Sequence, residues 1–225
     1  MAVPPEPAAL ILDLDGVVTD TAAQHEMAWR STLESRGIPF DAAAYERTRG
    51  RSRTDSLREL LGDHPVDPAT FEAMLSDKNR RYVDALGHLG LKDVLPGIIN
   101  LLLTAEGQGW KVGIGSSSRN ASIVLDSIGI TDLFDAIADR TSGAPKPAPD
   151  IFLAAAAMLD VAPAACIVIE DAASGVEAAL AAGMRVIGVG PEDRVGRAHV
   201  RVASTHDLSP ATLDEVARAA PSSGA

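Results

Sequence analysis

Short runs of apolar residues alternate with longer stretches of helical periodicity along most of this chain. The apolar runs are rich in β-branched residues and predict strands at residues 8–12, 110–115, 134–137, 166–169, 185–189 and 200–202. Helices are predicted between them, at residues 98–108, 120–128, 149–159, 174–182 and 211–219. Strands that alternate with helices in this way predict a doubly wound α/β fold, in which helices cover both faces of a parallel sheet.

Residues 21–90 interrupt this alternation, because they contain no convincing strand. Their apolar spacing predicts helices at residues 22–36, 42–48, 54–61 and 68–86. We therefore predict two domains: a Rossmann-like core made of residues 1–20 and 93–225, and an all-helical cap domain inserted at residues 21–92. An insert directly after a strand suits a cap over an active site, although a purely structural subdomain is the alternative. The insert is unusually basic, with Arg47, Arg49, Arg51, Arg53, Lys78, Arg80 and Arg81.

The overall charge narrows the range of partners. The chain has 31 Asp and Glu against 20 Lys and Arg, a net charge of −11, which argues against nucleic acid or an anionic membrane as a partner. No apolar run approaches the roughly 18 residues that a membrane-spanning helix needs, and the first residues do not resemble a signal peptide. Cys166, the single cysteine, lies within a predicted strand, so no disulfide is expected. We expect a cytoplasmic monomer.

Polar side chains follow four of the predicted strands. In doubly wound sheets, ligands bind outside the carboxyl ends of the strands, so we expect these side chains to meet in one site. Each signal has an ordinary alternative when taken alone: a turn for the aspartates, a helix N-cap for the serines, and a structural connector for the proline-flanked lysine. In chain order, the residues are Asp13 and Asp15, then Ser116, Ser118 and Asn120, then Lys146, then Glu170 and Asp171.

Together, these residue types suit phosphoryl transfer. Two carboxylates one residue apart repel each other unless a cation compensates them, and a second carboxylate pair would complete a site of oxygen ligands for Mg²⁺. Hydroxyl groups and backbone N–H groups at the start of a helix bind phosphate. A carboxylate can attack phosphorus while a lysine neutralises the phosphoryl oxygens. The order of these parts along the chain is more specific than any one of them.

The stretch from Asp13 to Thr21, Asp-Leu-Asp-Gly-Val-Val-Thr-Asp-Thr, resembles the first motif of the haloacid dehalogenase superfamily of phosphoryl-transfer enzymes. The later loops match the other motifs, so the resemblance covers nearly the whole chain. It implies that Asp13 is the nucleophile and that Asp15 is the general acid and base, a role that contributes roughly 10²–10⁴-fold in rate. Ser116 would donate to the phosphoryl group and Lys146 would neutralise it. The implied Mg²⁺ ligands are Asp13, Asp15 through its carbonyl, Glu170 and Asp171.

Within the superfamily, the chain is similar to members that isomerise sugar phosphates. The implied function is a Mg²⁺-dependent mutase that interconverts beta-D-glucose 1-phosphate and glucose 6-phosphate. The phosphoryl group would pass through an aspartyl-phosphate enzyme and a beta-glucose 1,6-bisphosphate intermediate. The partner is thus expected to be a small sugar phosphate. The implied substrate-binding residues are His25, Trp29, Gly50, Arg53, Ser56, Lys78, Ser118, Arg119 and Asn120.

Two departures from the pattern bear on the substrate. The loop Arg140–Pro145 is about one residue shorter than is usual, with Pro145 in place of a small polar residue, and Arg51 stands where an apolar residue is common. Two alternatives therefore stay open. A sugar-phosphate phosphatase would use the same parts with water as the acceptor, and a sugar-phosphate-binding protein without catalysis would use the same fold.

Overall fold

The computed structural model describes residues 5–48 and 52–220 of the 225-residue chain. These residues divide into two compact units. The core unit contains the chain up to Asp20 and again from Gly90, and the cap unit is Thr21–Leu89. The predicted insert ended at residue 92, whereas the cap unit ends at Leu89. Residues 91–94 belong to the core unit because Thr19 Oγ1 donates a hydrogen bond to the carbonyl of Asp93 at 2.7 Å, and Thr19 also bridges to Val94.

The described part of the core unit contains a six-stranded parallel sheet in the order β3-β2-β1-β4-β5-β6. The predicted doubly wound fold is confirmed, since this order reverses direction at β1 and helices cover both faces. The strands β1, β2, β4 and β5 are almost wholly buried, which explains why they read as continuous apolar runs rather than alternating ones. The strand bounds are β1 Ala9–Leu12, β2 Lys111–Gly115, β3 Ala136–Ala138, β4 Cys166–Glu170, β5 Arg185–Val189 and β6 Val200–Val202.

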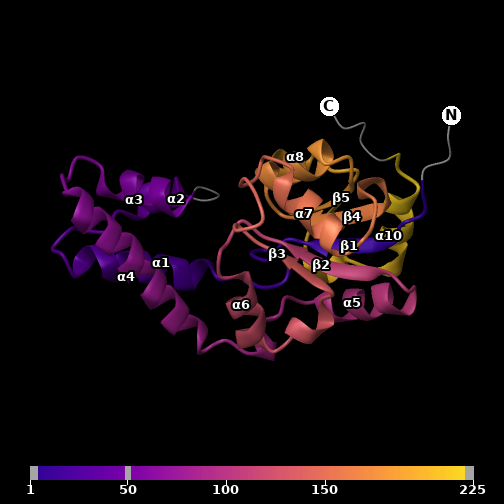
Figure 1. Cartoon of the computed structure of the whole chain (residues 1–225), viewed down its shortest axis with the longest axis horizontal. Helices are drawn as coiled ribbons and strands as arrows, with labels where there is room; N and C mark the ends of the chain where they lie inside the picture. The colour runs from indigo at the N-terminus through magenta and orange to yellow at the C-terminus, as the bar shows by residue number, and fades with distance from the viewer. Residues whose placement is uncertain (1–4, 49–51, 221–225) are drawn as a thin grey trace. The chain divides into compact units, whose positions relative to one another are not determined.

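The helices of the core unit lie on the two faces of this sheet, with α7 and α8 on one side and α5 and α6 on the other (Figure 1). Ile151 and Phe152 of α7 and Val176 of α8 pack with Ile11 of β1 and Val168 of β4 in one buried cluster. The helix bounds are α5 Ile98–Gly107, α6 Ala121–Ile128, α7 Asp150–Met158, α8 Ala173–Ala181, α9 Glu192–Val195 and α10 Pro210–Ala217. Four 3₁₀ turns join them within the described residues, η1 Leu91–Asp93, η2 Thr131–Leu133, η3 Pro163–Ala165 and η4 Thr205–Asp207.

The cap unit is helical throughout its described residues. Its helices are α1 Ala22–Glu34, α2 Ala42–Glu46, α3 Arg53–Leu61 and α4 Pro68–Leu86. Asp67 caps α4 by accepting from the Thr70 N–H, and Pro68 occupies the first position of the helix, which fixes its start where the sequence predicts it. Trp29, Leu33, Leu57 and Met74 form the centre of the buried cluster between the helices. None of the helices in the described parts of the chain is long and apolar enough to cross a membrane.

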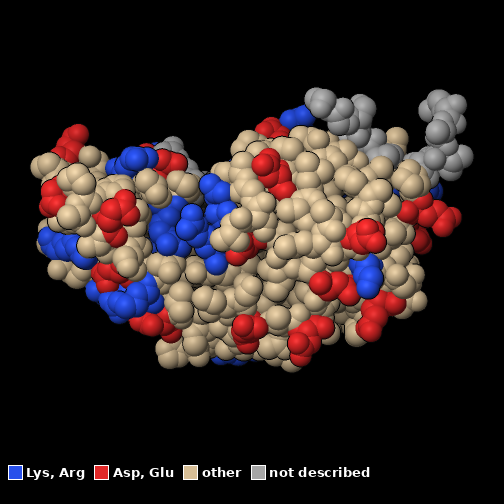
Figure 2. All heavy atoms as spheres, in the orientation of Figure 1, with Lys and Arg blue, Asp and Glu red and all other residues tan. Residues whose placement is uncertain are grey.

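On the face that Figure 2 shows, the Asp and Glu residues of the core unit are scattered among uncharged residues. One arginine of the core unit, by contrast, lies in its interior. Arg185 is fully buried and donates hydrogen bonds to the carbonyls of Pro5, Ala164 and Ala219, at 2.8 to 2.9 Å. The guanidinium therefore fastens residues near both ends of the chain to the start of β5.

Candidate active site

The carboxyl ends of β1, β2 and β4 lie side by side and place three predicted site residues together. Leu12 of β1 pairs with Ile114 of β2 and with Ile169 of β4. The next residue, Asp13, continues the pairing, since its N–H donates to the carbonyl of Ile169 at 2.9 Å. Asp13, Ser116 and Glu170 therefore emerge at neighbouring strand ends, and all three are buried. Leu14 is fully buried, as expected for the residue between the two aspartates.

Lys146 joins the two buried carboxylates of this edge. Its Nζ donates to Asp13 Oδ1, and to Glu170 Oε1 at 2.6 Å. Burial alone would lower the pKa of Lys146, but the adjacent carboxylates of Asp13 and Glu170 outweigh burial and raise it. The two carboxylates thus favour the charged form of Lys146. The peptide bond that follows it, Lys146–Pro147, is cis.

The carboxylate of Glu170 is fixed from two further directions. Its Oε2 accepts from the Ala172 N–H at 2.8 Å, at the start of α8. Gly175 of that helix lies directly against the carboxylate, and a methyl group there would overlap it. Both oxygens of Glu170 thus have protein partners, and each keeps a lone pair for a further contact.

Asp171 lies against Gly16, which belongs to the loop that follows β1. Gly16 has φ +88°, and a methyl group on it would overlap the Asp171 carboxyl. Burial, followed by the charge of Glu170, raises the pKa of Asp171 to about 6, while Arg194 and Lys146 oppose this shift. Arg194 approaches at 3.9 Å from the Asp171 Oδ2 atom. The geometry thus brings Asp171 to the peptide that follows Asp15.

The donor set fits a divalent cation by charge and by chemistry. Asp13, Glu170 and Asp171 contribute three carboxylates against the single ammonium of Lys146, and all their donor atoms are oxygens, which Mg²⁺ prefers. Burial, the largest cause, and the neighbouring carboxylates together raise the pKa of Asp13, an effect that Lys146 opposes. A bound cation would relieve this crowding of negative charge. As they stand, the described residues contain no group of three His, Cys, Asp or Glu arranged to hold a metal ion.

The loop after β2 presents hydroxyl groups beside these carboxylates. Ser116 is 2 % exposed, and its Oγ accepts from the Ser118 N–H at 3.1 Å. Ser118 Oγ in turn accepts from the Asn120 N–H at 3.1 Å. Each hydroxyl is used here as an acceptor, so its own proton can be donated to an anion at the start of α6. Asn120 is buried, whereas the intervening Arg119 is exposed.

In the cap unit, several predicted substrate-binding residues form one buried group. Lys78 is 2 % exposed, and its Nζ lies 2.5 Å from His25 Nδ1 and 5.2 Å from the centre of the Trp29 ring. Burial lowers the pKa of His25 well below its usual value, and the charges of Lys78 and Arg53 lower it further. This environment favours the neutral ring, whose Nδ1 can accept a hydrogen bond from Lys78.

Tyr82 belongs to this group but was not predicted. Its ring stacks on His25 with centres 4.0 Å apart, and its hydroxyl lies 3.1 Å from Thr21 Oγ1. It lies one helical turn after Lys78, and that spacing was the available signal. Ser56 is buried in α3, where Arg53 is the first residue. Gly50, together with Arg49 and Arg51, lies outside the described residues.

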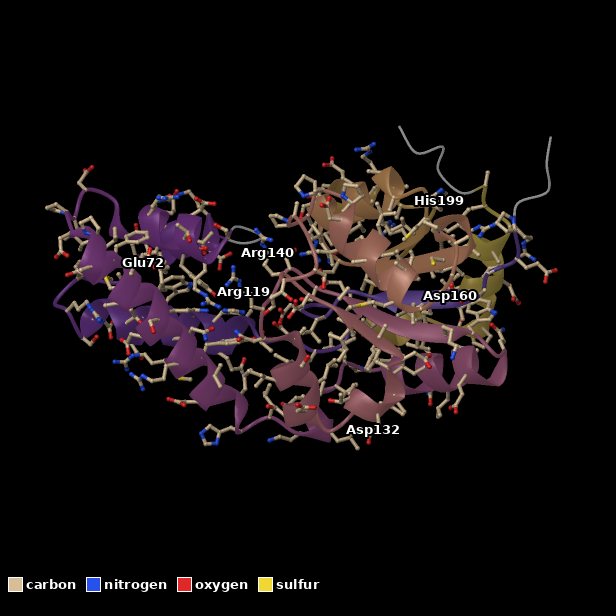
Figure 3. The ribbon with its side chains drawn as sticks, in the orientation of Figure 1. Glu72, Arg119, Asp132, Arg140, Asp160 and His199 are labelled. Carbon is tan, nitrogen blue, oxygen red and sulfur yellow. The ribbon has the colours of Figure 1, made fainter. Side chains whose placement is uncertain are left out.

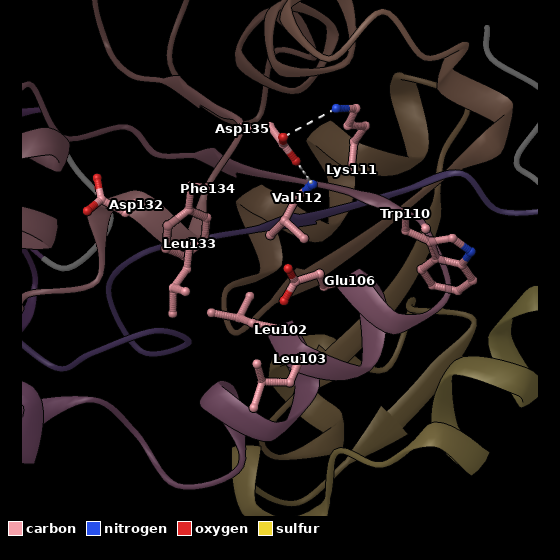
Figure 4. Close-up of a pocket in the computed structure, with 11 residues that line it drawn as sticks. Leu102, Leu103, Glu106, Trp110, Lys111, Val112, Asp132, Leu133, Phe134 and Asp135 are labelled. Atoms are coloured by element: carbon pink, nitrogen blue, oxygen red, sulfur yellow. Dashed lines mark hydrogen bonds and ion pairs between the residues drawn. The ribbon is translucent and has the colours of Figure 1, made fainter.

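A cavity of about 340 Å³ in the core unit lies away from these residues. It is lined by α5, the start of β2 and the segment around η2, including Leu102, Trp110 and Phe134 (Figure 4). Asp135 spans its edge, pairing with Lys111 at 3.4 Å and accepting from the Val112 N–H. This is the amino end of β2, opposite to Ser116, and none of the predicted site residues line the cavity.

Comparison with known proteins identifies the family to which this chain belongs. The sequence profile of the haloacid dehalogenase-like hydrolases matches residues 7–183. Beta-phosphoglucomutase of Bacillus subtilis is 44% identical over 212 residues, which cover 92% of this chain and 94% of that protein. Fructose-1-phosphate phosphatase YqaB of Escherichia coli is 34% identical, covering 81% of this chain and 96% of its own.

A solved structure extends this likeness to three dimensions. Beta-phosphoglucomutase from Clostridium difficile superposes with a TM-score of 0.86 at 38% identity, and the match covers 94% of this chain and 97% of that one. The superfamily inferred from the Asp13 motif is confirmed by the profile and by these relatives. The chain therefore belongs to the haloacid dehalogenase-like hydrolase family.

Proposed function

We propose that this enzyme is a Mg²⁺-dependent mutase that interconverts beta-D-glucose 1-phosphate and glucose 6-phosphate. The observation that carries the proposal is the 44% identity to the Bacillus subtilis beta-phosphoglucomutase, which extends over both units of the chain. The buried group around Lys78 in the cap unit supports it, since a mutase must hold the sugar and the phosphate that is not reacting.

Asp13 is the proposed nucleophile. One of its carboxylate oxygens would attack the phosphorus of a sugar bisphosphate, forming an acyl phosphate as the P–O bond to the sugar breaks. Asp15 would give its proton to the departing sugar oxygen and take one from the other hydroxyl in the return step. Lys146, which contacts Asp13, would neutralise the phosphoryl oxygens, and Ser116 would donate its hydroxyl proton to one of them.

Asp13, the Asp15 carbonyl, Glu170 and Asp171 are the proposed Mg²⁺ ligands. When bound, the ion would supply positive charge against the oxygens of the transferring group. Glu170 already has Lys146 and the Ala172 N–H as partners, and its remaining lone pairs would be available to the ion.

The proposed substrate contacts outside this centre are shared by both units. In the cap unit, His25, Trp29, Arg53, Ser56 and Lys78 would hold the sugar and its second phosphate, together with Gly50, which is not described. In the core unit, Ser118, Arg119 and Asn120 would complete the set. The acidic net charge fits a small-molecule partner rather than nucleic acid. A cytoplasmic monomer remains our expectation.

The decisive assay uses beta-glucose 1-phosphate with Mg²⁺ and a catalytic amount of beta-glucose 1,6-bisphosphate. Glucose 6-phosphate and free phosphate are measured in the same reaction, with alpha-glucose 1-phosphate as the control substrate. A mutase gives glucose 6-phosphate without stoichiometric release of phosphate, and discriminates against the alpha anomer. Release of phosphate without glucose 6-phosphate would refute the proposal.

The main alternative is a sugar-phosphate phosphatase. It is favoured by the 34% identity to the Escherichia coli fructose-1-phosphate phosphatase, which covers 81% of the chain. The two functions share the Asp13 chemistry and differ in whether water or a sugar hydroxyl accepts the phosphoryl group. The free-phosphate measurement separates them directly.

A further inference from the structure

The loop before Lys146 presents an arginine that the family resemblance does not assign. Residues 139–143 form a tight turn in which Asp139 accepts from the Thr141 N–H at 2.8 Å, and Ser142 Oγ accepts from the Asp139 N–H at 3.2 Å. Arg140 lies within this turn and donates from one terminal nitrogen to the carbonyl of Gly143 at 2.6 Å. The turn therefore holds the arginine in place while leaving most of its N–H groups unused.

Arg119 is the nearest basic residue along this edge. It is exposed, and its side chain forms no hydrogen bond or ion pair with the parts of the chain that the structure describes. Arg47 and Arg197, in contrast, pair with carboxylates, with Glu59 at 2.7 Å and with Glu177 at 3.0 Å. The exposed guanidinium of Arg119 therefore has donors available for an anion.

The backbone brings Arg119 and Arg140 to the same place. β2 and β3 are adjacent parallel strands, and the segments that follow them stay paired, since the Arg140 N–H donates to the carbonyl of Ser118 at 3.3 Å. Figure 3 shows the two arginines on the same side of the core unit. Both lie next to the hydroxyl-rich loop that opens α6, and neither has a carboxylate within ion-pair distance among the described residues.

We propose that Arg140 is a further substrate-binding residue that acts with Arg119 as an anion subsite for the second anionic group of the substrate. Guanidinium groups donate paired hydrogen bonds to phosphate, and here two of them have donors to spare. The inference rests on the proposed function for the identity of that substrate and makes it more specific. The enzyme should prefer sugar phosphates that carry a second phosphate, and part of that preference should reside in the core unit.

The test is calorimetric and needs no turnover. In an Asp13→Asn background with Mg²⁺, two ligands are titrated: beta-glucose 1,6-bisphosphate and inorganic phosphate. Adding Arg140→Ala should weaken bisphosphate binding by about tenfold or more, because one charge-assisted contact is lost. Binding of inorganic phosphate should change by less than about twofold by the same arithmetic, since it lacks a second anionic end. Arg140→Lys should recover part of the affinity by restoring the charge.

Arg197→Ala is the matched control, since it removes a paired arginine from the same unit, and it should leave both affinities unchanged. Equal losses for both ligands in Arg140→Ala would indicate a merely structural effect of the 139–143 turn and would overturn the subsite. So would an unchanged bisphosphate affinity. Fructose 1,6-bisphosphate is titrated in parallel, and failure of both bisphosphates to bind better than phosphate would also overturn it. The mutase assay is an independent test. A wild-type enzyme without mutase activity would refute only the proposed function.

Discussion

Lys146 has an unusual environment for a lysine, because its side chain is 6 % exposed and contacts two carboxylates that come from different strands. One ammonium cannot neutralise both Asp13 and Glu170, and Asp171 adds a third negative charge nearby. The site therefore has an excess of negative charge, which the binding of Mg²⁺ and the transfer of a phosphoryl group would each change. Three substitutions at this scale, at Asp13, Asp15 and Asp171, test the different roles of these carboxylates.

Asp13→Asn should remove turnover while preserving the fold, because asparagine has nearly the same shape but cannot form an acyl phosphate. The variant is incubated with beta-glucose 1,6-bisphosphate and examined by mass spectrometry for a covalent phosphoryl group, with circular dichroism as the check on folding. We expect no phosphoenzyme. A variant that retains a rate near that of the wild type would exclude a covalent mechanism through Asp13.

Asp15→Asn should also abolish turnover, yet it should bind Mg²⁺ almost as well as the wild type, because the backbone carbonyl of Asp15 is the proposed ligand. Asp171→Ala should instead weaken Mg²⁺ binding by about tenfold or more, which corresponds to about 1.4 kcal/mol or more. Calorimetric titration of each variant with Mg²⁺ makes the comparison. Equal losses of affinity in the two variants would show that the Asp15 carboxylate is itself a ligand.

At the scale of elements, the junction between β4 and α8 holds the site in place. Only two residues separate the end of β4 from the start of α8, and Gly175 in the first turn of α8 leaves room for the carboxylate of Glu170. The helix and the catalytic edge are thus packed through a glycine that has no need of a positive φ. A side chain at this position would push the helix away from the strand end.

Gly175→Ala should destabilise the protein by about 1–3 kcal/mol, the usual cost of overpacking a buried site, and should also lower activity by displacing Glu170 from Lys146. The matched control is Gly107→Ala, at the last position of α5, where a methyl group would meet no atom within 4 Å. That change should be neutral or stabilise by about 0.4–1 kcal/mol. Urea unfolding of both variants tests the pair, and equal stabilities would contradict the packing argument.

A histidine joins β5 to the segment before β6. The Val186 N–H donates to His199 Nδ1 at 3.1 Å, and the His199 N–H donates to the carbonyl of Val186 at 3.0 Å. Burial lowers the pKa of His199 below 6.5, and Arg185 lowers it further, against an opposing backbone hydrogen bond at Ala220. The neutral ring is the form that can accept from Val186, so protonation would break this contact.

As the pH falls below about 6.5, His199 is therefore protonated in the unfolded state before it is protonated in the folded state. The free energy of unfolding then decreases. Above that pH the contribution is fully present. We expect the fall in thermal midpoint between pH 7.5 and pH 5.5 to be smaller in His199→Gln than in the wild type. The same substitution at the exposed His206 serves as the control. An unchanged fall in His199→Gln would show that His199 does not couple folding to pH.

The sequence predicted the larger elements well, because each carries its own local signal. Buried strands such as Arg185–Val189 are uninterrupted apolar runs after their first residue, and α4 has an N-cap and a proline at its start. The short α9 and the 3₁₀ turns were missed, since three or four residues show no periodicity. Arg185 is a related case, because nothing in its neighbours indicates that an arginine is buried against carbonyl groups.

The sequence predicted which residues form the candidate site, a prediction still to be tested, but it did not predict their contacts. The motif spacing indicated Asp13, Lys146 and Glu170, yet the bond from Lys146 to Glu170 joins residues 24 positions apart, which depends on how β4 pairs with β1. Tyr82 and Arg140 were not predicted as site residues. Helical spacing and loop length indicate where a residue lies along the chain, but they do not indicate which side chains it contacts. The predicted roles of the site residues remain to be tested by the variants.

At the scale of the whole molecule, the proposed reaction requires contributions from both units. Asp13 and Lys146 belong to the core unit, and Arg53 and Lys78 to the cap unit. A mutase binds its bisphosphate in two orientations, so it needs an anchor for whichever phosphate is not reacting. A phosphatase that acts on small esters needs only the core residues. The cap arginine therefore offers a test that distinguishes the two functions.

Arg53→Ala should lower kcat/KM for beta-glucose 1-phosphate by about one to two decades, because a charge-assisted hydrogen bond contributes roughly 1.5–3 kcal/mol. Hydrolysis of a small phosphate ester without a second anionic end should change little. Arg58→Ala is the control, since Arg58 lies on the same helix and pairs with Asp55 at the surface. Small and equal effects of Arg53→Ala on both substrates would favour the phosphatase.

The central position of β1 has a consequence for synthesis on the ribosome. β1 is the first strand to be made, yet its two neighbours are residues 111–115 and 166–170. The cap unit is synthesised between β1 and β2. It has a hydrophobic core of its own, and all its residues are present once Leu89 is made. The cap therefore has its partners early, whereas β1 is an apolar segment with two unpaired edges until β2 is made and with one until β4 is made. A nascent chain stalled before residue 166 should thus expose residues 9–12 as a chaperone-binding segment, with Asp13 not yet next to Glu170 and Asp171.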